Sequence, residues 1–242
     1  VRARRPDRVG INKKTILLAG ATGLVGNAVL QRCLADKSIT SVIIPSRRPV
    51  SIKHPKLANI VMDLLAGENG EPSAGLSDAI AKASSGKIDA YISALGTTIK
   101  TAGSREAFIS VDRDLVCRFA EIAKQQKARQ IVFVSSVGAT RQTSNFYLRV
   151  KGETEDLLER MKFHRVDILR PGVLLGSRED SRPGEAVAQK LSFIYNPFLQ
   201  GPLRRYRAIE ADTVAVAALQ LLKKKETGIF VHENAEMVQL SE

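Results

Sequence analysis

The chain has 242 residues, of which 44% are hydrophobic and 26% are charged. This composition is typical of a folded globular protein and excludes a fibrous or wholly disordered chain. The formal net charge is +12, which favours a polyanionic partner. However, the basic residues fall in short scattered runs, and the chain has no Trp and four Tyr, so we expect no nucleic-acid groove lined with aromatic side chains. No apolar run reaches the roughly 18 residues that a transmembrane helix requires.

The cysteines and the N-terminal segment bear on where the protein works. Cys33 and Cys117 fall within stretches of helical period, where free cysteines usually pack as small apolar residues. We therefore expect reduced thiols and a cytoplasmic setting. Residues 1–12 are basic, and we expect them to form a disordered arm; targeting to an organelle by this arm stays open.

Short β-branched runs alternate with longer stretches of helical period, which is the pattern of a parallel sheet covered by helices on both faces. The expected strands are residues 15–19, 41–44, 59–62, 90–93, 130–134, 165–169 and 229–232. The expected helices are residues 24–36, 76–85, 104–127, 145–162, 185–195 and 210–222. We predict an α/β fold, a doubly wound and mostly parallel Rossmann sheet of six to seven strands, in one domain over residues 13–242.

After Arg170 the alternation breaks into a stretch rich in Pro, Gly and Arg that continues to about Arg207. Segments beyond the last core strand of an open α/β sheet commonly carry ligand specificity. We therefore expect residues 171–207 to form a small loop or cap that serves a substrate or a partner.

A glycine-rich turn follows the first expected strand and opens the first expected helix. Gly20, Gly23 and Gly26 have the spacing Gly-x-x-Gly-x-x-Gly. Glycines at such a place allow a tight turn, and the free N–H groups of the helix start face an anion. We interpret the turn as the pyrophosphate site of a dinucleotide; the alternative is a plain turn between strand and helix.

The end of the second expected strand indicates which dinucleotide is bound. It reads Pro45-Ser46-Arg47-Arg48-Pro49, with no carboxylate to bind a ribose 2′-hydroxyl. Two guanidinium groups instead suit a 2′-phosphate, because their forked donors match phosphate oxygens. We predict NADP(H), that is NADPH or NADP+, as the cofactor; the alternative is a solvated basic loop.

A Ser, Tyr and Lys arrangement indicates carbonyl chemistry. Tyr147 and Lys151 are four residues apart on one expected helix and so share a face. A nearby cation favours the phenolate, which suits a proton donor to a carbonyl oxygen. Ser135 and Ser136 end the fifth expected strand, where a hydroxyl can polarise the carbonyl; we favour Ser136 slightly, and the alternative for both is a cap or turn.

Taken together, these residues resemble the atypical short-chain dehydrogenases/reductases, and among them the Tat-interactive, oxidoreductase HTATIP-like proteins and their bacterial relatives. The resemblance extends from Thr15 to about Glu185. It is carried by GATGLVG, SRRP, LGTT at 95–98, VDRD at 111–114, VSSVGA, SNFY at 144–147 with KGE at 151–153, RPGVLLG and DSRPGE at 180–185.

The resemblance implies a set of cofactor contacts in this chain. It implies phosphate contacts by Gly20, Thr22, Gly23, Leu24 and Val25, and a 2′-phosphate site at Arg47 and Arg48. It implies adenine contacts at Asp63 and Leu64, and contacts along the cofactor from Leu95 and Gly96. It also implies nicotinamide contacts from Tyr147 and Lys151, and a cover over the cofactor from Leu174 and Arg182. Without the resemblance, Asp63, Leu95 and Leu174 would be interpreted as strand-end or core residues. The family's relay Asn has no counterpart near Ser110 to Asp112.

Two functions remain open from the sequence. The first is an NADPH-dependent reductase of a small carbonyl or quinone-like molecule, with Tyr147 as proton donor. The second is an NADPH-sensing regulatory protein with little or no turnover, whose late segment meets a partner. A protein partner or a homodimer fits either function, and we expect no metal.

Overall fold

The computed structural model describes residues 13–65, 73–176, 199 and 201–242. The strands are β1 (Lys14–Ala19), β2 (Ile39–Ser46), β3 (Leu57–Val61), β4 (Ala90–Ser93), β5 (Gln130–Val134), β6 (Arg165–Arg170), β7 (Leu174–Leu175), β8 (Ile209–Glu210) and β9 (Gly228–Glu233). The helices are α1 (Leu24–Ala35), α2 (Leu76–Ser84), α3 (Ile99–Ala102), α4 (Arg105–Ile109), a π-helical segment (Ser110–Leu115), α5 (Val116–Gln125), α6 (Phe146–Arg160), a 3-10 helix (Gly201–Tyr206), α8 (Ala211–Leu221) and α9 (Asn234–Ser241).

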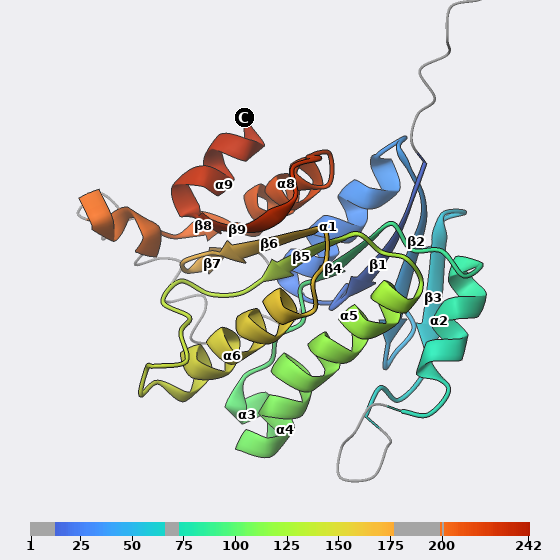
Figure 1. Cartoon of the computed structure of the whole chain (residues 1–242), viewed down its shortest axis with the longest axis horizontal. Coiled ribbons are helices and arrows are strands. Elements are labelled where there is room, and N and C mark those ends of the chain that lie inside the picture. Colours follow the sequence, from blue (N-terminus) through green and yellow to red (C-terminus); the bar gives the residue numbers. More distant parts are fainter. Residues whose placement is uncertain (1–12, 66–72, 177–198, 200) are drawn as a thin grey trace, which may run out of the picture.

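Seven parallel strands form the central sheet in the order β3-β2-β1-β4-β5-β6-β9 (Figure 1). The chain moves outward from β1 to β3 and then returns to β4 on the other side of β1. The loops after β1 and β4 therefore diverge at the carboxyl edge of the sheet, which is where open α/β sheets bind their ligands. The predicted doubly wound fold is confirmed.

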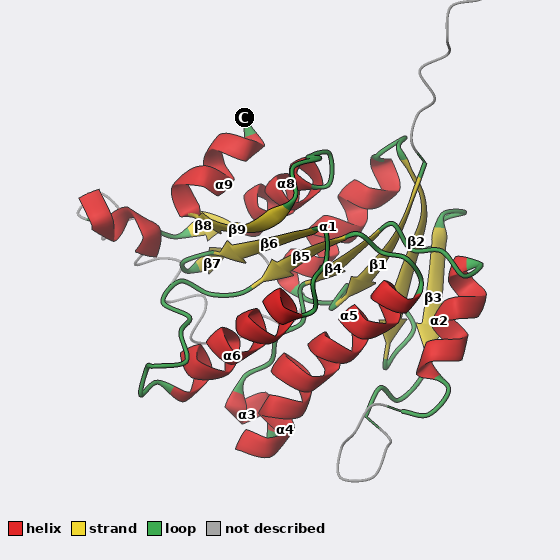
Figure 2. Cartoon of the chain, in the orientation of Figure 1, coloured by secondary structure: helices red, strands yellow, loops and turns green. Residues whose placement is uncertain are grey.

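Both faces of the sheet are covered by helices, as Figure 2 shows. In β1, Ile16, Leu17, Leu18 and Ala19 are all fully buried, because successive side chains point to opposite faces and both faces are packed. One apolar cluster joins the sheet to α1, α8 and α9, and the other joins it to α2, α5 and α6. Strands buried on two sides position their carboxyl-end loops rigidly.

Some elements depart from the sequence-based expectation. The bounds of β4 and β5 agree with it, but the single helix expected at 104–127 is divided by the π-helical segment. The 3-10 helix lies in a stretch expected to be a loop, and α3 and α9 were not expected. The arm at residues 1–12 and the helix expected at 185–195 lie outside the described residues.

The late segment, at residues 171–207, is joined to the chain that follows it by a two-stranded parallel sheet of β7 and β8. Gly172 lies against the backbone of Tyr206 and Arg207, where a Cβ on Gly172 would approach the Arg207 carbonyl oxygen to 2.3 Å. The Gly172 amide also donates to Asn234 Oδ1 at 2.9 Å. The chain after β6 is thus fixed beside the start of α9.

The described residues also show where the cysteines lie and set a limit on membrane insertion. Cys33 is fully buried and Cys117 is half-buried, and burial raises the pKa of both thiols to about 12. Both thiols are therefore poor nucleophiles at neutral pH. No helix in the described part of the chain is long and apolar enough to cross a membrane.

We predict that Gly26→Ala destabilises the protein, although alanine normally stabilises a helix interior by about 1 kcal/mol relative to glycine. A Cβ at this position would lie 2.0 Å from the Gly20 carbonyl oxygen, so helix and turn would have to separate. We expect the free energy of unfolding to fall by about 2 kcal/mol, measured by urea denaturation. Asn27→Ala, at an exposed position of the same helix turn, is the control. A stabilised Gly26→Ala variant would contradict this packing.

Candidate functional site

The glycine-rich turn has the geometry of an anion site. Gly20 adopts a left-handed conformation with φ +83°, and a Cβ there would lie 2.5 Å from the Ala94 carbonyl oxygen, so only glycine fits. The Gly23 amide donates to the Gly20 carbonyl at 2.9 Å and closes the turn. Helix α1 then begins at Leu24, and no side chain caps its first N–H groups. These amides are therefore available to a phosphate.

The other residues of this turn divide between exposed and buried positions. Thr22 is exposed, whereas Val25 is 5% exposed and packs in the core. Leu24 and Leu174 pack against the same apolar cluster, and a Cβ on Gly176 would lie 2.8 Å from Leu24 Cδ1. Residues 174–176 therefore lie close to Leu24 of the glycine-rich turn, and the cover of a cofactor by Leu174 stays a prediction.

The loop after β2 is held by hydrogen bonds to β3, and its two arginines are exposed to solvent. Asn59 on β3 donates to Ser46 Oγ at 2.7 Å and accepts from the Val50 amide at 3.0 Å. Ser46 Oγ in turn donates to the Arg48 carbonyl at 2.7 Å. Arg47 and Arg48 are exposed, and neither makes an ion pair with a described residue. The backbone of the loop is fixed while both guanidinium groups are available to a ligand.

Asp63 and Leu64 follow β3 at the same edge of the sheet. Asp63 Oδ1 accepts from the Leu65 amide at 3.1 Å and so stabilises its own turn. The Leu64 side chain is 6% exposed and belongs to the core. The carbonyl groups of both residues accept hydrogen bonds from Ser73, so the second carboxylate oxygen of Asp63 is the group that this pair can offer to a ligand.

Lys151 on α6 and Asp112 in the π-helical segment form a buried ion pair. Lys151 Nζ lies 2.9 Å from Asp112 Oδ1, and the two side chains are 4% and 0% exposed. Burial by itself would lower the pKa of Lys151, but the Asp112 carboxylate, with smaller contributions from Tyr147 and Glu155, raises this pKa above its ordinary value. Lys151 is therefore an ammonium at physiological pH.

The same pair fixes the loop that follows β4. Lys151 Nζ donates to the Leu95 carbonyl at 3.3 Å, and the Thr97 amide donates to Asp112 Oδ2 at 2.9 Å. Between them, a Cβ on Gly96 would lie 3.7 Å from Asp112 Oδ1. Leu95 and Gly96 therefore lie beside the ion pair. They directly follow Ala94, whose carbonyl oxygen lies close to Gly20.

Tyr147 lies one helical turn before Lys151 near the start of α6. Asn145 begins this helix by accepting the Leu148 amide at 3.1 Å on its side chain. The Tyr147 ring makes an edge contact with Phe108 at 6.0 Å between centroids, and the residue is 36% exposed. The phenol is held by this ring contact and remains accessible.

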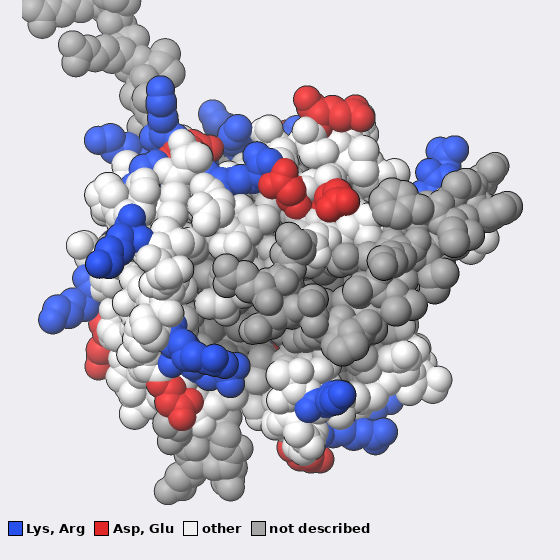
Figure 3. Space-filling view, turned by 180° about the vertical axis from the view of Figure 1, so that it is seen from behind, with Lys and Arg blue, Asp and Glu red and all other residues white. Residues whose placement is uncertain are grey.

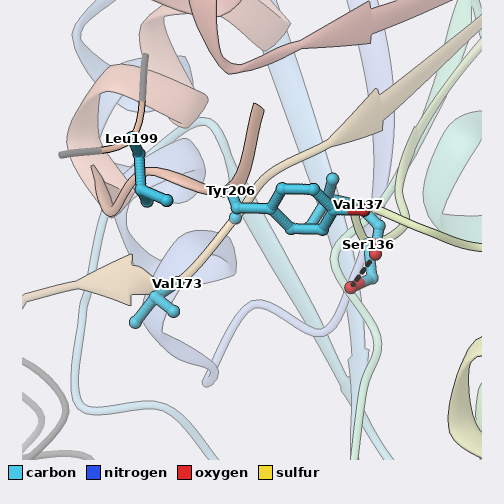
Figure 4. Close-up of a pocket in the computed structure, with 6 residues that line it drawn as sticks. Ser136, Val137, Val173, Leu199 and Tyr206 are labelled. Atoms are coloured by element: carbon cyan, nitrogen blue, oxygen red, sulfur yellow. Dashed lines mark hydrogen bonds between the residues drawn. The ribbon is translucent and has the colours of Figure 1, made fainter. Parts of the chain in front are cut away.

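The two serines at the end of β5 face different surroundings. Ser135 is buried and its Oγ donates to Glu155, which also forms a two-pronged ion pair with Arg170. Ser136 instead lines a cavity of about 500 Å³. In Figure 4, the Tyr206 ring reaches toward Val137 and Ser136, while Val173 and Leu199 lie on the other side of the cavity. Of the two hydroxyls, that of Ser136 is at the cavity.

Sequence reasoning missed three charged members of this region. Asp112, Glu155 and Arg170 are all involved in buried or half-buried ion pairs. Asp112 and Arg170 fall within the VDRD and RPGVLLG motifs of the resemblance, but nothing in the sequence shows which partners they or Glu155 have. Arg182, expected over the cofactor, lies outside the described residues. Within the described ranges, no three or more His, Cys, Asp or Glu are grouped to hold a metal ion.

Fold and site together define a Rossmann-type dinucleotide-binding protein. The profile of the NAD(P)H-binding family matches residues 20–225, and the chain belongs to this family. It is 35% identical to protein HTATIP2 of Rattus norvegicus over 180 residues, which are 74% of this chain and 71% of that protein. It is 33% identical to protein FMP52, mitochondrial, of Meyerozyma guilliermondii over 226 residues, 91% of this chain and 92% of that protein.

Solved structures show the same fold. The ligand-free aldohexose dehydrogenase of Thermoplasma acidophilum matches with a TM-score of 0.65 at 18% identity, over 91% of this chain and 92% of that one. The relatives bear out the resemblance to the HTATIP-like proteins. The cytoplasmic setting stays a prediction, and the name of the fungal relative assigns that protein to mitochondria.

We predict that the two serines differ in their effect on stability. Ser135→Ala leaves the buried Glu155 and Arg170 pair short of one donor, which should lower the free energy of unfolding by about 1–3 kcal/mol. Ser136→Ala, the matched control, should change it by less than about 0.5 kcal/mol, because the Ser136 hydroxyl makes one long bond of 3.4 Å to the Val137 carbonyl. Thermal and urea unfolding measure both, and equal losses would contradict this division.

Proposed function

We propose that the protein is an NADPH-dependent reductase of the atypical short-chain dehydrogenase/reductase type, acting on a small carbonyl or quinone-like molecule. One observation carries the proposal: the buried Lys151 ammonium lies one helical turn from the accessible Tyr147 phenol, and Ser136 lines a cavity near the carboxyl edge of the sheet. Membership of the NAD(P)H-binding family supports it.

The described residues fit a dinucleotide. The start of α1 has no side-chain cap, and the Gly20 turn lies close against the Ala94 carbonyl; both features suit a pyrophosphate. The exposed Arg47 and Arg48 suit a 2′-phosphate. Asp63 and Leu64 would lie at the adenine, and Leu95, Gly96 and Lys151 toward the nicotinamide ribose. When bound, NADPH supplies the hydride.

In the proposed reaction, Tyr147 donates its phenolic proton to the carbonyl oxygen of the substrate as that oxygen gains negative charge. The Lys151 ammonium stabilises the resulting phenolate by charge attraction. Ser136 Oγ donates to the same carbonyl oxygen and orients it. Because Tyr147 is 36% exposed, solvent can return the proton.

The cavity favours an apolar substrate. Val137, Val173 and Leu199 form much of its lining, while Ser136 and Tyr206 supply hydroxyl groups. The Lys and Arg side chains on the face in Figure 3 lie in separate small groups, with acidic side chains beside several of them. We therefore propose a neutral carbonyl compound with an apolar body, oriented by the hydroxyls.

We predict that Arg47→Ala weakens NADPH binding by about 1.5–3 kcal/mol, because a charge-assisted bond to the 2′-phosphate is lost. NADH affinity should stay unchanged, since NADH has no such phosphate. Fluorescence titration of both nucleotides measures this. Arg129→Ala removes an exposed arginine just before β5, at the opposite edge of the sheet, and serves as control. Equal losses for NADPH and NADH, or none, would refute NADP(H) selectivity at this loop.

We predict that Tyr147→Phe retains NADPH affinity and loses turnover by about two to four orders of magnitude, the usual contribution of a positioned proton donor. NADPH consumption is followed with wild type and variant across a panel of aldehydes, ketones and quinones. A wild type that binds NADPH but consumes none of it with this panel would overturn the reductase and leave the sensing function.

A further inference from the structure

The helix after β4 is interrupted at the point where it meets Lys151. Residues Ser110–Leu115 are π-helical between α4 and α5, and such interruptions frequently mark functional sites. Asp112 lies in this segment and is completely buried. Its carboxylate contacts Lys151 and the Thr97 amide, and its carbonyl lies 3.1 Å from the Thr154 hydroxyl of α6. The π-helical segment is therefore tied to α6 and to the loop after β4.

We propose that Asp112 is a positioning residue of the reductase site: its carboxylate holds Lys151 as an ammonium beside Tyr147 and the Leu95 carbonyl, and fixes the Leu95–Thr97 loop that borders the cofactor site. This inference rests on the proposed function. The chain lacks the relay Asn near Ser110 to Asp112. In the proposal, the Asp112 carboxylate, which contacts Lys151 directly, takes over the positioning of Lys151.

A purely structural explanation accounts poorly for this pair. Two apolar side chains of similar volume would fill a buried space as well or better, because desolvation of two charges costs several kcal/mol. Asp112 Oδ1 has no aligned hydrogen-bond donor among the described residues, so the attraction of Lys151 at 2.9 Å is what satisfies it. An unpaired ammonium at this depth would lose its proton.

The surroundings of Lys151 leave Asp112 as its main counter-charge. Tyr147 and Glu155, on the same helix, are the other titratable groups that act on Lys151. Glu155 is engaged by Arg170 and Ser135. The ring of Phe133 on β5 lies 5.2 Å from Lys151 Nζ and carries no charge. Removal of the Asp112 charge therefore leaves Lys151 without a free carboxylate.

The first experiment titrates Lys151 directly in the cofactor-free protein by NMR of ¹³C-labelled lysine side chains, with Lys151→Met to assign the signal. In wild type we expect the pKa of Lys151 to lie above its ordinary value of 10.5. In Asp112→Asn we expect this pKa to fall below 10.5, because burial then acts without the counter-charge. Asp114→Asn, in the same π-helical segment but 42% exposed and paired with Arg113, should leave it unchanged.

The second experiment is a double-mutant cycle on NADPH affinity, measured by fluorescence titration at mildly alkaline pH. Asp112→Asn and Lys151→Met should each weaken binding about tenfold, which is about 1.4 kcal/mol. If Asp112 acts through Lys151, the double variant should bind no more weakly than either single variant. The double variant should also unfold less easily than Lys151→Met, in which Asp112 is left buried and unpaired.

The outcomes separate this inference from the proposed function. An unaltered Lys151 titration in a folded Asp112→Asn variant, or additive losses of NADPH affinity, would overturn the positioning role. Should Asp112→Asn fail to fold, the wild-type titration still decides, because a Lys151 side chain that has lost its proton at neutral pH contradicts a carboxylate-held ammonium. The titration needs neither cofactor nor substrate, so its result stands if no carbonyl compound is reduced.

Discussion

The Lys151 ammonium and the Asp112 carboxylate are both buried, and the charge of each offsets the cost of burying the other. The pair also reaches beyond itself. Through the Leu95 carbonyl and the Thr97 amide it fixes the loop after β4, and the Ala94 carbonyl of that loop sets how closely the Gly20 turn can approach. The glycine-rich turn and the proton-donor region are therefore positioned by one connected set of contacts, although they lie far apart in the sequence.

The two ends of the site differ in their exposure. At the end that we propose for the adenosine, Arg47 and Arg48 are exposed and their loop is held by Asn59 and Ser46, so a phosphate could be bound there without burying unpaired charge. At the end that we propose for the nicotinamide, Lys151 is buried and paired with Asp112. Interactions at the exposed end are screened by water and salt, which suits selectivity for a nucleotide. Interactions at the buried end are less screened, which suits the stabilisation of a transient charge.

The doubly wound parallel sheet and most element bounds could be predicted because they depend on local patterns. β4 and β5 are short runs of buried residues, and their alternation with helices implies a parallel sheet. The π-helical segment could not be predicted, because residues 104–127 have the sequence period of a regular helix. The local geometry of the segment depends instead on its contacts with α6, which lies far away in the sequence. The same holds for the 3-10 helix at Gly201–Tyr206, whose Pro and Gly content is typical of a loop.

The candidate site was predictable where a motif fixes backbone geometry and unpredictable where a partner decides the role of a side chain. Gly20, Tyr147 and Lys151 follow from spacing, but the choice between Ser135 and Ser136 depends on Glu155, twenty residues later in the sequence. Asp112 shows the same limit more strongly. An acid within an apolar helix is ordinarily an error in patterning, and only the distance to Lys151 turns it into the counter-charge that keeps a buried lysine protonated. The charge state of Lys151 therefore depends on its contact with Asp112 in the folded protein and cannot be inferred from either residue alone.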